Sequence, residues 1–290
     1  MKIKKAVITA AGLGTRLLPA TKTIPKEMLP IVDKPAIQYI AEECAAAGIT
    51  DILVIISRGK QTIEDHFDRS PELEARLAET GKTELLEEMR KITELANFTF
   101  VRQPIQLGLG SAILCAEKFA GNEPFAVLYG DDVIVGEDPA VGQLVRAYEK
   151  YGKSVVGIQR VPKEDICKYS SMKLEPMPES SIYAVSDMIE KPQRGEEFSD
   201  FSILGRCILE PEIFDILRRI PKGKGGELQL TDAMREIAVN DGMIGVDFSG
   251  NRFDMGSRIG IIKAAIEVGL MRDDIRSELS EYIKKISEKL

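Results

Sequence analysis

Residues 6–40 read "AVITAAGLGTRLLPATKTIPKEMLPIVDKPAIQYI", a short apolar run that breaks into a loop before an amphipathic stretch resumes. The apolar start predicts a buried strand. In the loop, Gly12 and Gly14 allow backbone amides to approach a phosphate without interference from a Cβ atom. Arg16 offers a planar pair of donors for phosphate oxygens, and Lys26 lies between two prolines that stiffen its backbone. The stretch therefore predicts a strand followed by an anion-binding loop.

The two glycines alone are weak evidence, because an ordinary strand-to-helix turn can also contain Gly-x-Gly. The dinucleotide-binding fingerprint needs a third glycine where this chain has Leu17, and the phosphate loop GxxxxGK[ST] is absent from the sequence. The charges favour a ligand more strongly. Residues 12–34 carry a local excess of positive charge within a chain whose net charge is −7. A small anionic ligand is the natural interpretation.

Strand-like and helix-like patterns alternate through the first half of the chain. The apolar runs that predict strands are 4–11, 51–57, 98–103, 124–132 and 154–161. The segments that predict helices are 35–48, 61–96, 109–120 and 139–150, the second of them divided at Pro71 and Gly81. This order is typical of an α/β fold whose mostly parallel sheet is covered by helices on both faces.

The motifs of the sequence follow predicted strands. GLGTR follows the first strand, RQPIQLGLG the third and GDD the fourth. Because ligands of open α/β sheets bind beyond the carboxyl ends of the strands, we expect these loops to meet at one edge of the sheet. Later in the chain, shorter strands are predicted at 181–189, 202–209 and 243–249, and a helix pair at 257–288. With no repeat or clear linker, the pattern indicates one elaborated domain with a C-terminal helical appendage.

Composition limits the class of protein. A chain of 290 residues with 44% hydrophobic residues can bury a large core, and its net negative charge argues against a nucleic-acid surface. It shows no signal sequence and no apolar run long enough for a membrane helix, so we expect a soluble cytoplasmic protein. The cysteines lie far apart without a CxxC pair and are expected to be buried free thiols: Cys44, Cys115, Cys167 and Cys207.

The loop AAGLGTRLLPATKTIPKEMLPIVDKP closely resembles the N-terminal loop of sugar-nucleotide pyrophosphorylases, in the bacterial UTP–glucose-1-phosphate uridylyltransferase branch. Further motifs of that family follow in the same order: RQ…GLGSAI from Arg102, GDD at 130–132, EKP at 190–192, GRCIL at 205–209, GELQLTDA at 226–233 and FDMG at 253–256. The resemblance spans nearly the whole chain apart from its C-terminal end.

The resemblance implies a Rossmann-like nucleotidyltransferase fold with a mostly parallel mixed sheet. It places a nucleotidyltransferase domain at 1–256, with a nucleotide-binding part at about 1–135 and a sugar-binding part at about 136–256, and the helical appendage at 257–290. The implied reaction is Mg²⁺-dependent transfer of a uridylyl group from UTP to glucose 1-phosphate, which gives UDP-glucose and pyrophosphate. We also expect a homo-oligomer, a dimer or a tetramer.

The resemblance also assigns roles to residues of this chain. Arg16 and Lys26 would hold the triphosphate and stabilise the departing pyrophosphate, while Lys191 would bind the sugar phosphate. The implied catalytic residues are thus Arg16, Lys26 and Lys191; the nucleotide-binding ones are Ala10, Ala11, Gly12, Gly14, Glu27, Gln103 and Gly108; the sugar-binding ones are Glu190, Lys191 and Gly205; and the Mg²⁺ ligands are Asp131 and Asp254.

The chemistry of such a reaction needs no general base, because a sugar phosphate is already mostly ionised at neutral pH, with a second pKa of about 6. His66, the only histidine, lies away from every motif and is expected to be incidental. Catalysis then consists of aligning two polyanions and cancelling their repulsion. Mg²⁺ typically takes one or two carboxylates plus phosphates and waters, which suits Asp131 and Asp254, with Asp132 as the weaker candidate.

Two local features need the fold to be understood. Glu190 and Lys191 end a predicted strand, and neighbours in extended backbone point to opposite faces, so one of them needs the following turn to reach a shared pocket. The segment 220–229, rich in Gly, Pro and Lys, is equally consistent with a mobile flap over the sugar site and with a solvated turn.

Departures from the family pattern leave the sugar selectivity open. The family usually reads GLGHA, LPDD, GRY and Tyr-Gly where this chain has Gly108-Leu-Gly-Ser111-Ala, Leu128-Tyr-Gly-Asp-Asp, Gly205-Arg-Cys207 and Tyr169-Ser170. A thymidylyltransferase or other nucleotidyltransferase on a related sugar 1-phosphate is therefore the alternative within the family. Two hypotheses from other classes also remain, a non-catalytic nucleotide-sugar sensor and a Rossmann-type oxidoreductase. The missing third glycine weakens the last of these.

Overall fold

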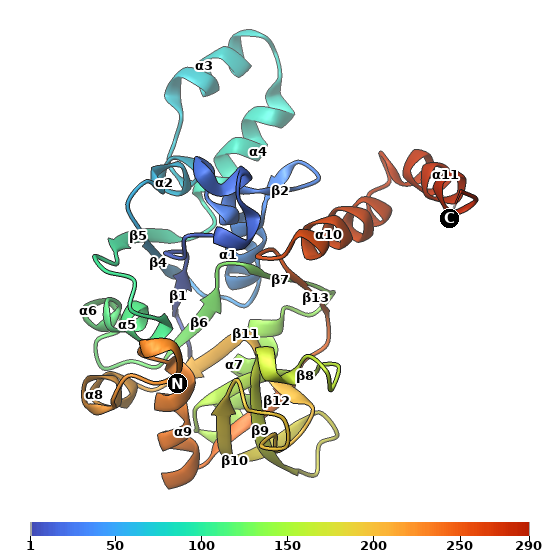
Figure 1. Cartoon of the computed structure of the whole chain (residues 1–290). Helices are drawn as coiled ribbons and strands as arrows, with labels where there is room; N and C mark the ends of the chain where they lie inside the picture. The colour runs from blue at the N-terminus through green and yellow to red at the C-terminus, as the bar shows by residue number, and fades with distance from the viewer. Residues whose placement is uncertain (1, 290) are drawn as a thin grey trace.

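A nine-stranded mixed sheet forms the centre of the computed structural model, which describes residues 2–289 (Figure 1). In spatial order the strands are β5 (Asn97–Arg102), β4 (Asp51–Ile56), β1 (Lys5–Thr9), β6 (Phe125–Tyr129), β11 (Phe201–Leu209), β8 (Val155–Arg160), β12 (Met243–Asp247), β10 (Ile182–Glu190) and β9 (Ser170–Pro176). Only β11 and β10 run against the other strands, so the predicted, mostly parallel sheet is confirmed.

Helices cover both faces of the sheet, as the alternating pattern predicted. They are α1 (Ala36–Ala46), α2 (Gln61–Phe67), α3 (Pro71–Glu79), α4 (Thr83–Thr93), α5 (Leu109–Leu114), α6 (Glu117–Ala120), α7 (Ala140–Tyr151), α8 (Glu212–Arg219), α9 (Leu230–Asn240), α10 (Arg258–Met271) and α11 (Arg276–Ser287). The predicted divisions at Pro71 and Gly81 are both present, because Pro71 begins α3 and Gly81 has a φ of 69° in the turn before α4. The single helix expected at 109–120 is two helices.

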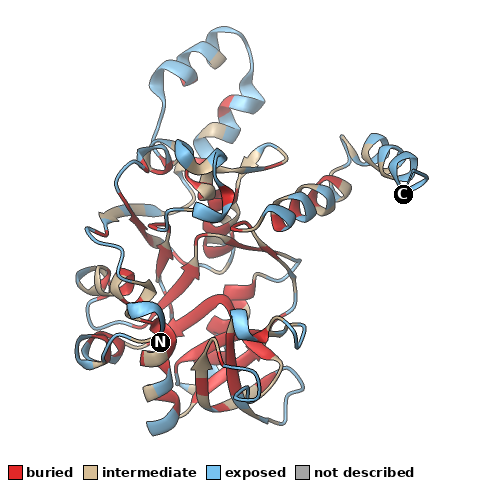
Figure 2. Cartoon of the chain, viewed as in Figure 1, coloured by how far each residue is buried: buried red, intermediate tan, exposed pale blue. Residues whose placement is uncertain are grey.

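Side chains of each strand alternate between the two faces of the sheet, and each face packs against its own apolar core. In β1, Ile8 belongs to the core beneath α1 and α7, whereas its neighbour Val7 belongs to the core beneath α5, α8 and α9. Both side chains are fully buried, as are most residues of the central strands (Figure 2). Burial on both faces explains why these strands read as continuous apolar runs in the sequence.

Several elements lie outside the sequence prediction. The strand expected at 124–132 ends at Tyr129, and Asp132 begins a separate strand, β7 (Asp132–Val135), which pairs with β13 (Asn251–Asp254). This pairing sets Asp132 opposite Asp254, so two motifs far apart in sequence lie side by side. The helices α8 and α9, the strand β9 and the small β2–β3 sheet (Pro30–Ile31 with Lys34–Pro35) are further additions.

The C-terminal helices α10 and α11 extend away from the sheet, as predicted for the appendage (Figure 1). The Ser257 hydroxyl caps α10 by accepting a hydrogen bond from the Gly260 amide at 3.0 Å. No helix within residues 2–289 is long and apolar enough to cross a membrane. The cysteines are all free; Cys44 and Cys207 are buried, but the prediction of burial is wrong for the partly exposed Cys115 and the exposed Cys167.

A buried ion pair fixes α1 against the sheet. Arg206 of β11 is completely buried, and its Nη2 and Nε atoms lie 2.6 and 3.0 Å from the two carboxylate oxygens of Glu43 in α1. Glu43 also accepts a hydrogen bond from the Val141 amide at the start of α7, at 2.8 Å. Arg206 donates further to the backbone oxygen of Asp132 at 2.9 Å. The pair therefore holds α1, α7, β11 and the start of β7 together.

Glu43→Gln removes the negative charge while keeping the side-chain volume. A buried charge that loses its partner costs about 3–5 kcal/mol, so we expect a loss of that order in the free energy of unfolding measured with urea. Asp215→Asn is the matched control, because its Arg218 pair is exposed and should contribute less than about 1 kcal/mol. Equal urea midpoints for the two variants would contradict this account of α1.

Candidate active site

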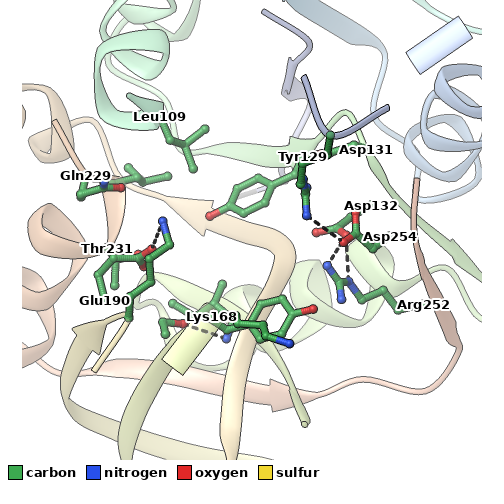
Figure 3. Close-up of a pocket in the computed structure, with 16 residues that line it drawn as sticks. Leu109, Tyr129, Asp131, Asp132, Lys168, Glu190, Gln229, Thr231, Arg252 and Asp254 are labelled. Carbon is green, nitrogen blue, oxygen red and sulfur yellow. Dashed lines mark hydrogen bonds and ion pairs between the residues drawn. The ribbon is translucent and has the colours of Figure 1, made fainter. Parts of the chain in front are cut away.

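Two adjoining cavities open at the carboxyl ends of β1 and β6, where the sequence predicted that the loops would meet. The glycine-loop cavity, of about 500 Å³, is lined by the loop after β1 and by the segment before α5. The β10 cavity, of about 370 Å³, is lined by the ends of β10 and β13 and the start of α9 (Figure 3). Leu109, Tyr129 and Asp131 belong to the walls of both, so the cavities meet at these residues.

The glycine-loop cavity contains most of the expected nucleotide-binding residues, namely Ala11, Gly12, Gly14, Gln103 and Gly108, together with Lys26, which was expected to be catalytic. Gly108 has a φ of 103°, and a Cβ atom there would lie 2.8 Å from the backbone oxygen of Leu228, so the position requires glycine. The Gln103 amide nitrogen donates to the Ser111 hydroxyl at 2.7 Å. The same nitrogen donates to the Gly108 carbonyl at 3.3 Å, which leaves the Gln103 carboxamide oxygen to accept from a ligand.

Ala10 and Glu27 do not line either cavity, and their contact with a nucleotide stays a prediction. Glu27 is completely buried, and both of its carboxylate oxygens accept hydrogen bonds from Lys60 Nζ, at 2.9 and 2.8 Å. Lys60 Nζ also donates to the Ala10 carbonyl at 2.5 Å. Ala10, Glu27 and Lys60 therefore support the glycine loop from the protein interior. Burial raises the pKa of Glu27, while Lys60 and Lys26 lower it.

The sequence analysis missed Lys60. It precedes α2 in the SRGK segment that follows β4, at the same edge of the sheet as the other motifs. Its position after a predicted strand was the available signal. The strand pattern alone gives no sign that the side chain turns inward to a carboxylate 33 residues earlier.

Four charged groups meet where the cavities join. Lys26 Nζ lies 2.5 Å from Asp131 Oδ2, and Arg16 Nη1 lies 3.5 Å from Asp254 Oδ2. Although burial raises the pKa of Asp131, the Lys26 ammonium and Arg16 lower it, and the net pKa falls below its ordinary value. Burial lowers the pKa of Lys26, but Asp131 and Glu27 raise it further, so both partners stay charged at neutral pH.

The two expected metal ligands lie around one glycine. A Cβ atom on Gly256 would be 2.9 Å from Asp131 Oδ2, 2.9 Å from Asp254 Oδ1 and 2.5 Å from Arg16 Nη2. Among residues 2–289, no group of three or more His, Cys, Asp or Glu side chains could hold a metal ion. Two facing carboxylates beside a phosphate-sized cavity fit Mg²⁺, which usually completes its shell with phosphates and water.

Asp132 has a different environment from Asp131. It is buried, and its Oδ1 atom lies 2.5 Å from Nη2 of Arg252. Burial raises the pKa of Asp132 to about 6, with Arg252 acting in the opposite direction and Asp131 adding to the rise. Gly205 is buried in β11 beside it and does not line either cavity, so its assignment to the sugar site stays a prediction. With a φ of 72°, Gly205 would bring a Cβ atom within 2.6 Å of Asp132.

Glu190 and Lys191 both line the β10 cavity. The sequence analysis predicted that the turn after the strand is needed to bring both side chains into one pocket. Lys191 has a φ of 46°, in the left-handed region, and its Nζ atom lies 3.4 Å from Glu190 Oε1. This backbone turn brings two neighbouring side chains into one cavity. Glu190 also accepts a hydrogen bond from Thr231 at 2.8 Å. Ser170, which differs from the residue usual in the family, lines the same cavity.

The segment 220–229 borders both cavities. The Leu228 amide donates to the Leu107 carbonyl at 2.7 Å, and the Leu228 carbonyl accepts from the Gly110 amide at 2.8 Å. Glu227 lines the glycine-loop cavity and Gln229 the β10 cavity. The segment is thus anchored to the wall of the site at one end, and its role as a mobile flap stays a prediction.

His66 lies away from both cavities. It is in α2, where its Nε2 atom is 3.0 Å from the Gln38 amide oxygen. Burial lowers its pKa, with Glu42 opposing the shift. Neither cavity includes this side chain, in agreement with the expectation that the histidine is incidental.

The chain belongs to the nucleotidyl transferase family, whose sequence profile matches residues 5–268. It is similar to a UTP–glucose-1-phosphate uridylyltransferase of Bacillus subtilis, with 53% identity over 285 residues, covering 98% of this chain and 96% of the relative. Among solved structures, a UDP-glucose pyrophosphorylase complexed with UDP-glucose has 43% identity and a TM-score of 0.85, covering 93% of this chain and 100% of that chain. A UTP-bound UGPase from Acinetobacter baumannii has 36% identity and a TM-score of 0.89, covering 97% and 98%. The family resemblance is confirmed.

Gly256→Ala tests the charged centre with one methyl group. The added Cβ meets the ends of flexible side chains, so the fold can adjust, but Arg16, Asp131 and Asp254 must all move. Displacing aligned groups by about 1 Å can cost on the order of 10²-fold in rate, and we expect a fall of that size in nucleotidyl transfer with little change in Tm.

Gly142→Ala, in α7, is the control for this variant. Its added Cβ atom would lie 3.5 Å from the nearest surrounding side-chain atom, which is an ordinary contact distance. It should retain the activity of the parent chain. Full activity of Gly256→Ala in a steady-state assay would mean that the three charged groups do not act together.

Proposed function

We propose that the chain transfers the uridylyl group of UTP to glucose 1-phosphate, giving UDP-glucose and pyrophosphate. The observation that carries this proposal is the junction of two cavities at Asp131, with Lys26, Arg16 and Asp254 around it. A nucleoside triphosphate and a sugar phosphate are both anions and must meet at one phosphorus atom. The named activity of the similar Bacillus subtilis protein supports this pair of substrates.

The glycine-loop cavity is proposed as the nucleotide site, within the part at about 1–135. Backbone groups of Ala11, Gly12 and Gly108 line it together with Gln103. Uracil presents one N–H donor between two carbonyl acceptors, and the Gln103 carboxamide oxygen can accept from that N–H group while its nitrogen donates to Gly108 and Ser111. Lys26 and Arg16 then face the triphosphate at the mouth of the cavity. Gln103 is the side chain best suited to read the base.

The β10 cavity is proposed as the acceptor site, within the part at about 136–256. Glu190 offers carboxylate oxygens to sugar hydroxyls, and Lys191 offers an ammonium group to the sugar phosphate. Thr231 fixes the Glu190 carboxylate through its 2.8 Å hydrogen bond. Among the residues that depart from the family pattern, Tyr129 and Ser170 belong to this wall, whereas Cys207 is completely buried, so Tyr129 and Ser170 are the departures that bear on sugar selectivity.

The reaction requires alignment and charge compensation. An oxygen of the glucose 1-phosphate forms a bond to the α-phosphorus of UTP, and the bond from that phosphorus to the bridging oxygen of pyrophosphate breaks. The attacking phosphate needs no proton removed, which agrees with the absence of histidine from the cavity walls. Arg16 and Lys26 neutralise the charge that moves to pyrophosphate, and Lys191 holds the acceptor.

Nucleotidyl transferases of this family are generally Mg²⁺-dependent, and we propose Asp131 and Asp254 as the ligands in this chain. When bound, Mg²⁺ would supply compensation for the charge of the phosphate oxygens. Asp131 must release Lys26 to face the metal, and a triphosphate offers that ammonium new partners. We also propose that the chain divides into a nucleotidyltransferase domain at 1–256 and a helical appendage at 257–290. We propose a cytoplasmic location as well.

We further propose a homo-oligomer. The extended helices α10 and α11 expose large apolar side chains to solvent in the single chain, among them Ile259, Ile262, Met271 and Tyr282. Such a surface is typical of a contact between subunits. Light scattering of the purified chain distinguishes a monomer from a dimer or tetramer.

Pyrophosphate release tests the proposed function. The chain is incubated with Mg²⁺, glucose 1-phosphate and each nucleoside triphosphate in turn, with and without a chelator. We expect release with UTP that chelation abolishes. Asp131→Asn and Asp254→Asn should each lower kcat strongly without unfolding the chain. UTP turnover that persists in a chelator would remove the metal assignment, and binding without turnover would favour a nucleotide-sugar sensor.

The two lysines should separate by substrate. Lys26→Ala is expected to impair UTP binding or the chemical step, whereas Lys191→Ala should chiefly raise the KM for glucose 1-phosphate, because the side chains line different cavities. Charge-assisted hydrogen bonds contribute about 1.5–3 kcal/mol, so each loss should exceed about 10-fold. Lys173→Ala is the control, because Lys173 is an exposed residue of β9. Identical kinetic defects in both variants would refute the division of labour.

The base preference should follow the acceptor and donor pattern of Gln103. We expect UTP first, dTTP as the nearest competitor because thymine differs only by a methyl group, and ATP and GTP poor. Gln103→Ala should erode this order by about 5- to 150-fold, the cost of an unpaired polar group. Gln143→Ala, in α7, is the matched control. In competition assays at equal triphosphate concentrations, a clear preference for ATP or GTP would contradict the base assignment.

A further inference from the structure

Tyr129 occupies the boundary between the proposed nucleotide and acceptor sites. It is the last residue of β6 and pairs with Thr9 of β1, at the edge of the sheet where both cavities open. It belongs to the walls of both cavities. In Figure 3 its ring crosses the β10 cavity, and its hydroxyl points toward the side that holds Leu109 and Gln229, away from Asp131.

The hydroxyl of Tyr129 lacks a partner among the side chains around it. No hydrogen bond joins it to the other residues drawn in Figure 3. Most of its charged neighbours are paired: Glu190 accepts from Thr231, and Asp132 from Arg252. A tyrosine hydroxyl can donate a hydrogen bond at neutral pH. Tyr129 is only partly buried and lines both cavities, so its hydroxyl is open to a ligand that enters them.

The acceptor substrate has a suitable group at this place. Its phosphate must lie near Asp131, where the cavities join, so its sugar ring extends toward Glu190 and Thr231. The Tyr129 hydroxyl points to the same region from β6, while Glu190 reaches it from β10, four positions away in the sheet. The two side chains therefore approach the ring from different walls and meet different hydroxyls.

We propose that Tyr129 determines acceptor specificity by donating a hydrogen bond to one ring hydroxyl of the hexose 1-phosphate, a hydroxyl other than those bound by Glu190. This inference rests on the proposed function and adds a residue to its acceptor site. The side chain acts on binding and orientation of the sugar, and it takes no part in bond making at phosphorus.

Tyr129→Phe removes the hydroxyl and keeps the ring. With UTP and Mg²⁺, kcat/KM is measured for glucose 1-phosphate and for its 2-, 3-, 4- and 6-deoxy analogues. We expect the variant to lose on the order of 10-fold with glucose 1-phosphate, with an unchanged KM for UTP. With the one analogue that lacks the partner hydroxyl, the variant and the parent chain should be equally active. The other analogues should show the full loss.

Tyr183→Phe is the matched control, since Tyr183 lies in β10 but lines neither cavity. It should behave as the parent chain with every analogue. The Tm of Tyr129→Phe should also be unchanged, because the hydroxyl has no partner before the sugar binds. A clear fall in its Tm would contradict the proposal by showing that the hydroxyl serves the fold.

Kinetic results separate this inference from the function on which it rests. Parent activity with UTP and glucose 1-phosphate, together with unchanged Tyr129→Phe kinetics, would overturn the inference alone. A loss expressed in the KM for UTP, or one equal for all analogues, would also overturn it. If the parent chain released no pyrophosphate with these substrates, the proposed function would fail and the inference with it.

Discussion

The contact between Lys26 and Asp131 joins the two loops on which the site depends. Lys26 follows β1 and Asp131 follows β6, and the parallel pairing of these strands brings the two ends to one edge of the sheet. At 2.5 Å, in a mostly buried setting, each group compensates the charge of the other. The same two side chains are those that a triphosphate and a metal ion would need. In the single chain, Lys26 and Asp131 therefore neutralise each other as an ion pair. A triphosphate and a metal ion can replace this contact by binding the two side chains separately.

Behind this contact lies a second layer of buried charges. Lys60 and Glu27 support the glycine loop, and Arg206 with Glu43 supports the start of β7 and the helix α1. Burying an unpaired charge is costly, so each of these groups is useful only with its partner in place. The layer holds the backbone of the site in position while the cavity side chains stay available for ligands. Rigid support of this kind favours alignment of two polyanions.

The sequence predicted most strands of the sheet, its main helices and part of the cavity walls, because apolar runs and strand-end motifs depend on local pattern. It did not predict the β7–β13 pairing, which depends on residues about 120 positions apart. Residue type also did not tell whether a side chain faces ligand or protein. Glu27 lies in a motif at the site, but its side chain is buried against Lys60, whose charge no motif marked. Gly205 has no side chain and packs against Asp132. These distinctions arise from packing between distant segments.

The distance between Lys26 Nζ and Asp131 Oδ2 in a crystal structure with UTP and Mg²⁺ tests the central claim most directly. The account predicts that the 2.5 Å contact of the single chain is broken, with Lys26 on a phosphate oxygen and Asp131 facing the metal ion. An intact ion pair beside a bound triphosphate, with the metal held elsewhere, would contradict it.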